Sequence, residues 1–275
     1  LVFNYGPMYG AIIAFKDFRP GKGILGSEWV GLRHFINFFN GLYFWRLLRN
    51  TVLINVYQLI FSFPAPIILA LLLNEVKNEP FKRTVQSITY LPHFISLVVI
   101  CGLIVDFTAK DGLINDIIAM LGGERISILL EPHLFKPTYV ISGIWRGIGW
   151  NSIIYLSALS GIDPQLYEAA VIDGARRWRQ MLHITLPGIA PTIIIMLIMR
   201  LGQMMNVGFE KIILLYNPLT YETADVISSY VYRKGLLEMD YSYSAAVGIF
   251  NSVINLALLL LANKISRSVS ETSLW

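Results

Sequence analysis

Polar side chains interrupt the apolar stretches in the second half of the chain, and their spacing is the first sign of chemistry. Gln203, Asn206 and Glu210 recur at intervals of three and four residues, which predicts that they share one face of a helix. Asn251 and Asn255 form a similar pair in a later stretch. Polar groups inside an apolar span are costly, so they point to function. Because amides and carboxylates hydrogen-bond to hydroxyl groups, these residues are candidates for a substrate path that a polar solute follows.

Arg146 and Trp150 lie in an earlier apolar stretch and belong to the same candidate path. An aromatic ring can stack on a pyranose ring, and a guanidinium group offers charge complementarity to an acidic saccharide. A structural interpretation is also open. Asn and Gln often hydrogen-bond between neighbouring spans, and Arg146 can pair with an acid or extend toward the membrane surface. For Asn206 and Asn255 the two interpretations have equal support.

No arrangement of residues in the sequence indicates catalysis or metal binding. Cys101 is the only cysteine, which excludes a cysteine-rich metal site. There is no glycine-rich loop ending in Gly-Lys-Ser or Gly-Lys-Thr, so the chain has no P-loop of its own. The histidines fall in separate places, at His34, His93, His133 and His183. We therefore expect no enzyme activity, metal or cofactor in this chain.

The composition places these residues in a membrane. Of the 275 residues, 55% are apolar or aromatic and 15% are charged, and the mean hydropathy is +0.57. Soluble domains have about 25% charged residues, so a soluble domain of this composition would expose too much apolar surface. The net charge is only +4, and the basic residues lie in short loops rather than on one polar face, which argues against a nucleic-acid partner.

Six apolar blocks predict an all-α membrane protein with six transmembrane helices, because each span in lipid must satisfy its own backbone hydrogen bonds. The first block is shorter than the roughly 20 residues of a full span, and we interpret it as a truncated helix. The blocks cover about Leu1–Phe15, Leu47–Leu73, Val85–Phe107, Pro137–Leu159, Ile184–Leu215 and Ser244–Ala262.

The predicted organisation has three parts. Residues 1–46 contain the end of the first helix and an outer loop, residues 47–265 form the membrane core, and residues 266–275 form a polar tail. Basic residues occur in the loops on both sides, so the positive-inside rule alone does not assign an orientation.

A polar segment at residues 163–187, between the fourth and fifth blocks, predicts two short helices outside the bilayer. Asp163 can cap a helix whose first turn accepts the following proline. Gly174 is a predicted helix end, because glycine tolerates the left-handed conformation of a tight turn. A second polar helix is expected from Arg176, and Pro187 is expected to break the chain before the fifth span. From these features alone the segment could be an ordinary connector or a binding surface for a soluble partner.

The residue string of this segment closely resembles the EAA motif of binding-protein-dependent ABC importer permeases. The match consists of Glu168-Ala169-Ala170, Asp173-Gly174-Ala175, Ile184-x-Leu186-Pro187 and Pro191. Met181 stands where the family usually has phenylalanine, and methionine can fill the same apolar pocket.

The resemblance implies a MetI-like fold in which this segment docks into a groove on a cytoplasmic ATPase subunit. Glu168 would provide a polar contact and Gly174 the turn. The residues expected to take part in coupling are Glu168, Ala169, Ala170, Asp173, Gly174, Ala175, Arg176, Leu186 and Pro187.

The resemblance also implies the partners of the chain. These are a second permease subunit, two cytoplasmic ATPase subunits that bind ATP and Mg²⁺, an extracytoplasmic solute-binding protein and membrane lipid. The expected location is the bacterial cytoplasmic membrane, with the segment at residues 163–187 on the cytoplasmic side. The loops Glu28–Trp45 and Asn217–Tyr243 would then face outward, either to contact the binding protein or to anchor in the bilayer interface.

Several shorter strings are similar to carbohydrate-type permeases, and more narrowly to the subgroup serving alginate, aldouronate and related oligo- or polysaccharides. They are Asn4–Gly10, Ala14–Phe18, Trp29–Phe35, Asn50-Thr51, Tyr90-Leu91-Pro92 and Ser270–Trp275. This similarity implies a saccharide cargo. Alternatives are a permease for another solute, such as glycerol phosphate or a peptide, and a stand-alone secondary transporter, which would need an internal repeat that the sequence does not show.

Overall fold

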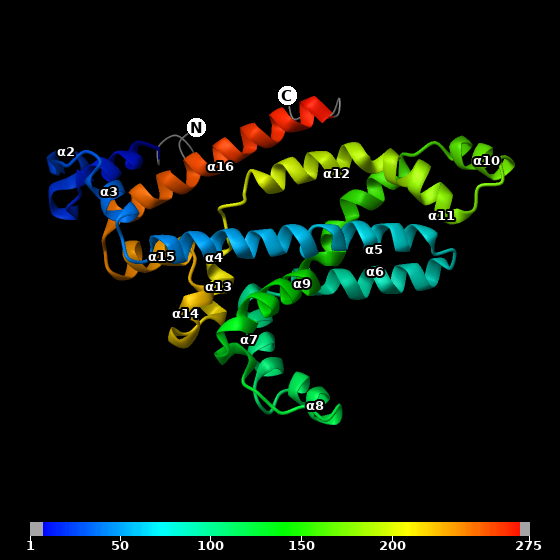
Figure 1. Ribbon diagram of the computed structural model, residues 1–275, viewed down its shortest axis with the longest axis horizontal. Helices are drawn as coiled ribbons and strands as arrows, with labels where there is room; N and C mark the ends of the chain where they lie inside the picture. The colour runs from blue at the N-terminus through cyan, green and yellow to red at the C-terminus, as the bar shows by residue number, and fades with distance from the viewer. Residues whose placement is uncertain (1–7, 270–275) are drawn as a thin grey trace. The chain divides into compact units, whose positions relative to one another are not determined.

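The computed structural model describes residues 8–269 (Figure 1). The string Asn4–Pro7 and the terminal string Ser270–Trp275, both used above, lie outside the described residues. Helices dominate this part of the chain, as the sequence predicts. The strands found in it are β1 (Lys16–Asp17) and β2 (Glu28–Trp29), which pair antiparallel near the start of the described range.

The longer helices correspond to the apolar blocks, and short helices connect them. The longer ones are α4 (Phe44–Tyr57), α5 (Pro64–Glu75), α6 (Glu79–Phe94), α7 (Leu97–Thr108), α9 (Pro132–Ser160), α12 (Leu186–Leu201) and α16 (Tyr241–Val269). The shorter ones are α2 (Gly23–Gly26), α3 (Arg33–Phe39), α8 (Leu113–Met120), α10 (Pro164–Ile172), α11 (Arg177–Gln180), α13 (Phe209–Leu215), α14 (Tyr221–Ala224) and α15 (Ile227–Tyr232).

Three continuous helical stretches within residues 8–269 are long and apolar enough to cross a membrane: Phe44–Glu75, Arg177–Leu201 and Tyr241–Ser268. The first of these joins α4 to α5 through a π-helical turn at Gln58–Ser62, which accommodates the proline that begins α5. A fourth candidate is the bent pair formed by α6 and the chain from Leu97 to Met120. The prediction of six spans therefore stays a prediction.

Two blocks predicted as single helices are interrupted in the structure. The third block bends by 103° between α6 and α7. Pro92 lies in the last turn of α6, and the Ser96 hydroxyl accepts a hydrogen bond from the backbone N–H of Val99 at the start of α7. The fifth block ends its helix at Leu201 and resumes only with α13, after two glycines that weaken a continuous helix. Hydropathy detects neither break, because the residues on both sides are apolar.

The described chain forms two compact units that alternate along the sequence. Within the described residues, the first contains 8–56, 101–138 and 203–258, and the second contains 57–100, 139–202 and 259–269. The core of the first unit is aromatic and aliphatic, made of Phe38, Phe44, Leu47, Met205, Ile227, Tyr230 and Val247. The core of the second unit joins α5, α9 and α12 through Ile67, Ala70, Tyr155, Leu159 and Ile189.

Candidate functional site

The first half of the polar segment is the helix α10, which begins as the sequence predicts. The Asp163 carboxylate caps it by accepting a hydrogen bond from the backbone N–H of Gln165, at 2.9 Å. Pro164 occupies the first turn, where a missing N–H leaves no carbonyl unsatisfied. Glu168 and Ala169 follow on the exposed surface of this helix.

The end of α10 is a tight turn at Gly174, whose φ of +75° confirms the predicted left-handed glycine. The backbone N–H of Ala175 donates to the Ala170 carbonyl at 2.8 Å, and that of Gly174 donates to the Val171 carbonyl at 3.0 Å. These bonds satisfy the last carbonyls of the helix. Asp173 is the C-cap residue, so the motif residues from Ala170 to Ala175 form one closed turn.

The second half of the segment differs from the prediction, because Pro187 does not break it from the fifth span. After Arg176 at its N-cap, α11 runs through a π-helical turn at Met181–Thr185 into α12. The whole stretch Arg177–Leu201 is one continuous helix (Figure 1). A π turn opens the hydrogen-bonding ladder just before Pro187, which has no N–H to contribute, so the helix continues through the proline.

Two contacts join α10 and the residue before its N-cap to the continuous helix. The hydroxyl of Tyr167 lies 3.0 Å from the hydroxyl of Thr185, and Thr185 is buried. Gly188 lies so close to Ile162 that an added Cβ would be 2.8 Å from its Cδ1 atom. Leu186, between them, is half-buried. The polar segment is therefore packed directly against the helix that continues into α12.

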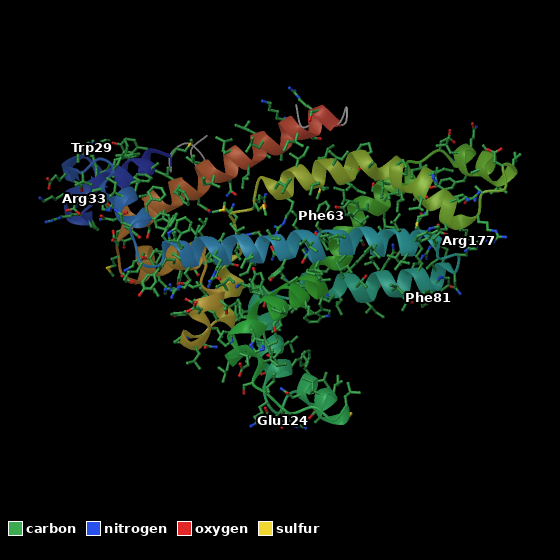
Figure 2. The ribbon with its side chains drawn as sticks, viewed as in Figure 1. Trp29, Arg33, Phe63, Phe81, Glu124 and Arg177 are labelled. Carbon is green, nitrogen blue, oxygen red and sulfur yellow. The ribbon has the colours of Figure 1, made fainter. Side chains whose placement is uncertain are left out.

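The charged side chains of the segment are exposed. Glu168, Asp173, Arg176 and Arg177 are all at the surface, and none of them takes part in an ion pair within residues 8–269. Figure 2 shows Arg177 at the outer edge of the segment. Exposed charges without partners, placed on a fixed turn, are suited to binding another polypeptide.

Apolar side chains lie among these charges, and a groove runs between the two short helices. Ile172 is 86% exposed and Trp178 is 68% exposed. The groove has a volume of about 400 Å³ and is lined by Ala170, Asp173, Ala175, Arg179, Gln180, His183 and Ile184. Large exposed apolar groups rimmed by charges mark protein–protein contact surfaces.

Within the first unit, the structure brings together three of the predicted path residues. The Asn206 side-chain carbonyl accepts hydrogen bonds from the amides of Asn251, at 2.8 Å, and Asn255, at 3.1 Å. The Asn255 carbonyl in turn accepts from the backbone N–H of Met205, at 2.9 Å. These contacts are those that the structural interpretation of Asn255 predicts, because its carbonyl caps the chain after the end of α12.

The prediction that Gln203, Asn206 and Glu210 share one helical face is wrong. α12 ends at Leu201, so Gln203 lies in a turn and Glu210 in the first turn of α13. All three side chains are exposed. Spacing of three and four places residues together only while the helix is unbroken.

Arg146 and Trp150 lie one turn apart on α9, in the second unit. Trp150 is 42% exposed and stacks on His93, with ring centroids 4.5 Å apart and planes within 3°. Phe94 packs edge-on against the same indole, 5.5 Å away. The Nε of Arg146 is buried and has no hydrogen-bond partner.

A close helix crossing holds this aromatic cluster in place. Gly149 approaches α6 so closely that an added Cβ would lie 2.3 Å from the carbonyl oxygen of Thr89. A larger residue at that position would force the helices apart, and Trp150 follows it directly. The sequence indicated the tryptophan but not the histidine that stacks on it, since the two come from different helices.

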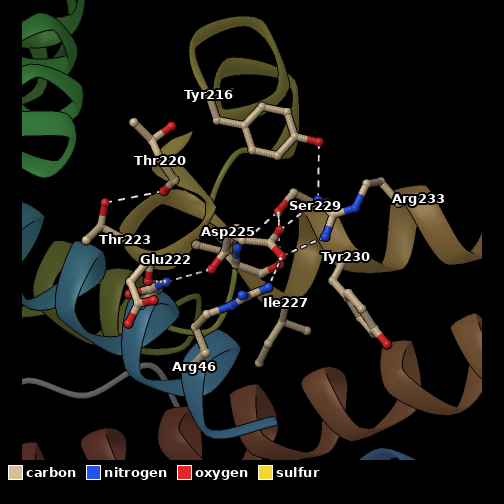
Figure 3. A network of polar contacts seen from close by, with 12 residues as sticks. Arg46, Tyr216, Thr220, Glu222, Thr223, Asp225, Ile227, Ser229, Tyr230 and Arg233 are labelled. Carbon is tan, nitrogen blue, oxygen red and sulfur yellow. Dashed lines mark hydrogen bonds and ion pairs between the residues drawn. The ribbon is translucent and has the colours of Figure 1, made fainter. Parts of the chain in front are cut away.

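A buried cluster around Asp225 is the most extensive polar network of the first unit (Figure 3). The carboxylate is fully buried and accepts hydrogen bonds from both terminal nitrogens of Arg233, at 2.8 and 2.6 Å. Arg46 of α4 pairs with it at 3.3 Å, and the Ser229 hydroxyl donates to it at 2.7 Å. The backbone carbonyl of Asp225 accepts from the Asn50 amide at 3.0 Å.

The cluster fixes the protonation of Arg233. Burial by itself would lower its pKa, but the hydrogen bonds to Asp225 and Tyr216 outweigh that effect and raise the pKa above the ordinary arginine value. Arg233 also stacks over the ring of Tyr221, 4.9 Å from its centroid. The guanidinium is therefore a permanent cation that holds Asp225 within the loop between the fifth and sixth blocks, and Arg46 and Asn50 join Asp225 to α4.

Sequence reasoning did not detect this cluster, because Arg46 and Asp225 are separated by 179 positions. The available signal was local: Asp225 is a single acid in an otherwise apolar stretch, Ala224-Asp225-Val226-Ile227. An isolated acid among apolar residues is seldom fully buried without a partner.

The family of binding-protein-dependent transport system inner membrane components matches residues 43–271. Among curated proteins, the polygalacturonan/rhamnogalacturonan transport system permease protein YteP of Bacillus subtilis (strain 168) is 48% identical over 276 aligned residues, covering 100% of this chain and 86% of YteP. Protein LplB of the same organism is 46% identical and covers 100% of this chain and 87% of its own length.

A solved structure resembles the chain over almost its full length. It is a bacterial alginate ABC transporter in complex with an alginate pentasaccharide-bound periplasmic protein. The matched chain superposes with a TM-score of 0.92 and 44% sequence identity, covering 99% of this chain and 91% of that chain.

These matches define the class of the protein as an ABC transporter permease with a MetI-like fold. The chain belongs to the family of inner membrane components of binding-protein-dependent transport systems, and several of its relatives are named as sugar or polysaccharide permeases.

Proposed function

We propose that this chain is the subunit of an importer that moves an acidic oligo- or polysaccharide across the bacterial cytoplasmic membrane, using ATP hydrolysed by partner chains. The observation that supports this most strongly is the turn at Gly174 with its exposed, unpaired charges. A permease that hydrolyses no ATP itself needs such a surface to receive work from an ATPase.

The proposed coupling runs through a short physical path. An ATPase subunit holds the turn between α10 and α11, with Glu168 and Arg176 as polar contacts and Ile172 as the apolar contact. When the ATPases close, the turn moves, and the continuous helix Arg177–Leu201 moves with it. The hydrogen bond between Tyr167 and Thr185 keeps the two halves of the segment moving together.

An acidic cargo is supported by the relatives and by the aromatic cluster on α9. The names of two similar proteins specify polygalacturonan/rhamnogalacturonan and alginate. Trp150 offers a stacking surface for a sugar ring, and Arg146, one helical turn away, offers a cation with an unsatisfied nitrogen. A charge-assisted hydrogen bond between guanidinium and carboxylate is stronger than a neutral one, so the site would favour uronic acids over neutral sugars.

The remaining partners follow from the class of importer. A second permease subunit would complete the translocation path, and an extracytoplasmic binding protein would deliver the saccharide. The loop that includes α14 and α15 is a candidate for this contact, because the Asp225 cluster holds it in one conformation.

The coupling proposal is tested with the assembled transporter in lipid nanodiscs. We expect Gly174→Val to abolish the stimulation of ATP hydrolysis by saccharide-loaded binding protein, because valine resists a φ of +75° and widens the turn. Gly122→Val is the matched control, since Gly122 also has a positive φ, of +85°, and open space around it.

The control separates docking from general backbone strain. If both variants lose stimulation equally, or if Gly174→Val retains it, the coupling assignment is wrong. Measurement of ATPase assembly by size-exclusion chromatography shows in addition whether the Gly174 variant still binds its partner.

The cargo proposal is tested separately with Arg146→Gln and Arg146→Lys. We expect glutamine to raise the KM for uptake of an oligouronate, lysine to raise it less, and neither to change uptake of a neutral oligosaccharide of equal length. Unchanged uptake of the oligouronate by Arg146→Gln would contradict the role of this residue. Preferential uptake of a peptide or of glycerol phosphate in the same panel would replace the saccharide proposal.

A further inference from the structure

The short helix α8 exposes one apolar face that has no role in the proposed transport mechanism. The face consists of large aliphatic side chains spaced one or two helical turns apart. Leu113 is 56% exposed, Ile117 is 51% exposed, and Met120 and Leu121 are each 84% exposed. A face of this kind needs an apolar environment.

A tight turn fixes α8 to the end of α7. α7 ends at Thr108, and Gly112 immediately precedes α8. A Cβ added to Gly112 would lie 2.2 Å from the carbonyl oxygen of Asp106 and 2.8 Å from that of Phe107. Since the backbone segments touch here, α8 starts at the same level as the end of α7.

The end of α7, α8 and the chain as far as Ile126 form a hairpin, and Asn115 joins its two ends. Its side chain is fully buried, and its amide donates to the backbone carbonyls of Ala109 and Ile126, both at 2.7 Å. Its carbonyl accepts from the backbone N–H of Ile126, at 3.0 Å. The hairpin is therefore held by its own contacts, and α8 presents a defined face.

A charged residue borders that face. Asp116 lies three residues after Leu113 and four before Met120, and it pairs with Arg125 at 2.6 Å. The side chains of Asp116 and Arg125 are about two-fifths exposed, and Glu124 is exposed further along the chain (Figure 2). The apolar face of α8 therefore has a charged edge.

We propose that α8 lies in the bilayer interface, with its apolar face against lipid acyl chains and its charged edge toward headgroups and water. α7 belongs to a candidate membrane span, and its last turn also exposes apolar side chains, Val105 at 42% and Phe107 at 38%. The apolar surface of α8 continues this lipid-facing surface around the Gly112 turn. An amphipathic helix at that level partitions into the interface.

The residue types favour lipid over a neighbouring protein span. Helices that pack together in membranes use small residues, which let the backbones approach closely. The apolar side chains that α8 exposes are leucine, isoleucine and methionine, and these bulky flexible side chains mix readily with acyl chains. α8 therefore anchors the bent span at its surface end.

Spin labelling of the assembled transporter in lipid nanodiscs tests this inference. Cys101 is first replaced by serine, and a single cysteine is introduced as Met120→Cys, or as Leu121→Cys in a second protein, and labelled with a nitroxide. Glu124→Cys is the matched control in the same hairpin. We expect the label at position 120 to collide with oxygen far more than with a water-soluble nickel chelate, and the control label to show the reverse preference.

Two results overturn the inference. A label at position 120 that is as accessible to the nickel chelate as the control shows that the face lies in water. A label inaccessible to both reagents, together with cross-linking of Met120→Cys to another subunit, shows that a protein covers the face. The Leu121→Cys protein repeats the measurement if the first variant fails to assemble.

Discussion

Charged residues have opposite surroundings in the polar segment at residues 163–187 and in the Asp225 cluster. In the polar segment, Glu168, Asp173 and Arg176 are exposed and have no ion-pair partner among the described residues. In the cluster, Asp225 is fully buried and two arginines neutralise it. The charges of the first region are free to contact another molecule, whereas those of the second are paired with each other inside the chain.

The comparison gives a way to tell a docking surface from a structural fastening. A buried charge is tolerated only when it is paired and hydrogen-bonded, so the Asp225 cluster has the features of a stabilising contact. An exposed charge contributes little to stability, so a group of exposed charges on a fixed turn has the features of a binding surface. Variants that alter stability without altering transport, or the reverse, test this distinction. Their expected effects on the free energy of unfolding decrease from Asp225→Asn to Glu168→Gln.

Asp225→Asn should have the largest effect on stability. It leaves Arg46 and Arg233, which are 25% and 19% exposed, without their shared counter-ion. Loss of one partner from a buried ion pair destabilises a protein by about 3 kcal/mol. The midpoint of thermal unfolding of the purified complex measures this effect. Asp116→Asn, in a half-exposed ion pair, is the control and should lower stability by less than about 1 kcal/mol; equal losses would refute the comparison.

Asn255→Leu should come next. The substitution removes the acceptor of the Met205 backbone N–H and leaves that buried donor unsatisfied, which costs about 1–3 kcal/mol. Asn251→Leu is the matched control, because Asn251 binds only the exposed Asn206 side chain and no backbone group. If Asn251→Leu lowers uptake without lowering the unfolding midpoint, while Asn255→Leu does both, the two asparagines have different roles. The opposite pattern would restore cargo contact for Asn255.

Tyr167→Phe should have a smaller effect, of about 1 kcal/mol, because it removes one hydrogen bond and keeps the ring. Its main consequence should be weaker coupling, seen as more ATP hydrolysed per saccharide imported. Thr185→Val removes the same bond from the other side, together with the longer bond from the Thr185 hydroxyl to the Gln180 carbonyl. If the shared bond acts as proposed, the double variant is no worse than Thr185→Val alone; additive losses would show that the two hydroxyls act separately.

Glu168→Gln should change stability least, by less than about 0.5 kcal/mol, because the side chain is exposed. We expect it nevertheless to reduce the ATPase stimulation caused by loaded binding protein. The unfolding midpoint and the stimulated ATPase rate are measured on the same preparation. Full stimulation in this variant would remove Glu168 from the proposed docking surface.

The sequence predicts well those features that depend on neighbouring residues. The cap at Asp163 and the left-handed turn at Gly174 follow from the local preferences of aspartate and glycine, and both are present. The apolar blocks likewise predict where the long helices lie, since hydropathy is a property of the local chain. Hydropathy does not predict where these helices are continuous. The π turn before Pro187, for example, lets the helix continue through a proline, a residue that usually ends a helix.

The features that could not be predicted depend on residues far apart in the chain. The side chain that accepts a hydrogen bond from Met205 belongs to Asn255, on a different helix. This contact stabilises the chain after the end of α12, where the predicted helical face of Gln203 and Asn206 is interrupted. The pairing of His93 with Trp150 and that of Arg46 with Asp225 also join separate helices. A single sequence shows that such groups need partners but not which ones they find.

The separation of Arg46 from Asp225 has a consequence for biosynthesis. The ribosome must add 179 further residues after Arg46 before Asp225 exists. At roughly 5–20 residues per second, the arginine waits on the order of 10–40 seconds for its counter-ion. During that time Arg46 and Asn50 are unpaired polar groups at the end of a helix that enters the bilayer. The nascent chain therefore needs water, lipid headgroups or the insertion machinery beside α4 until Asp225 has been made.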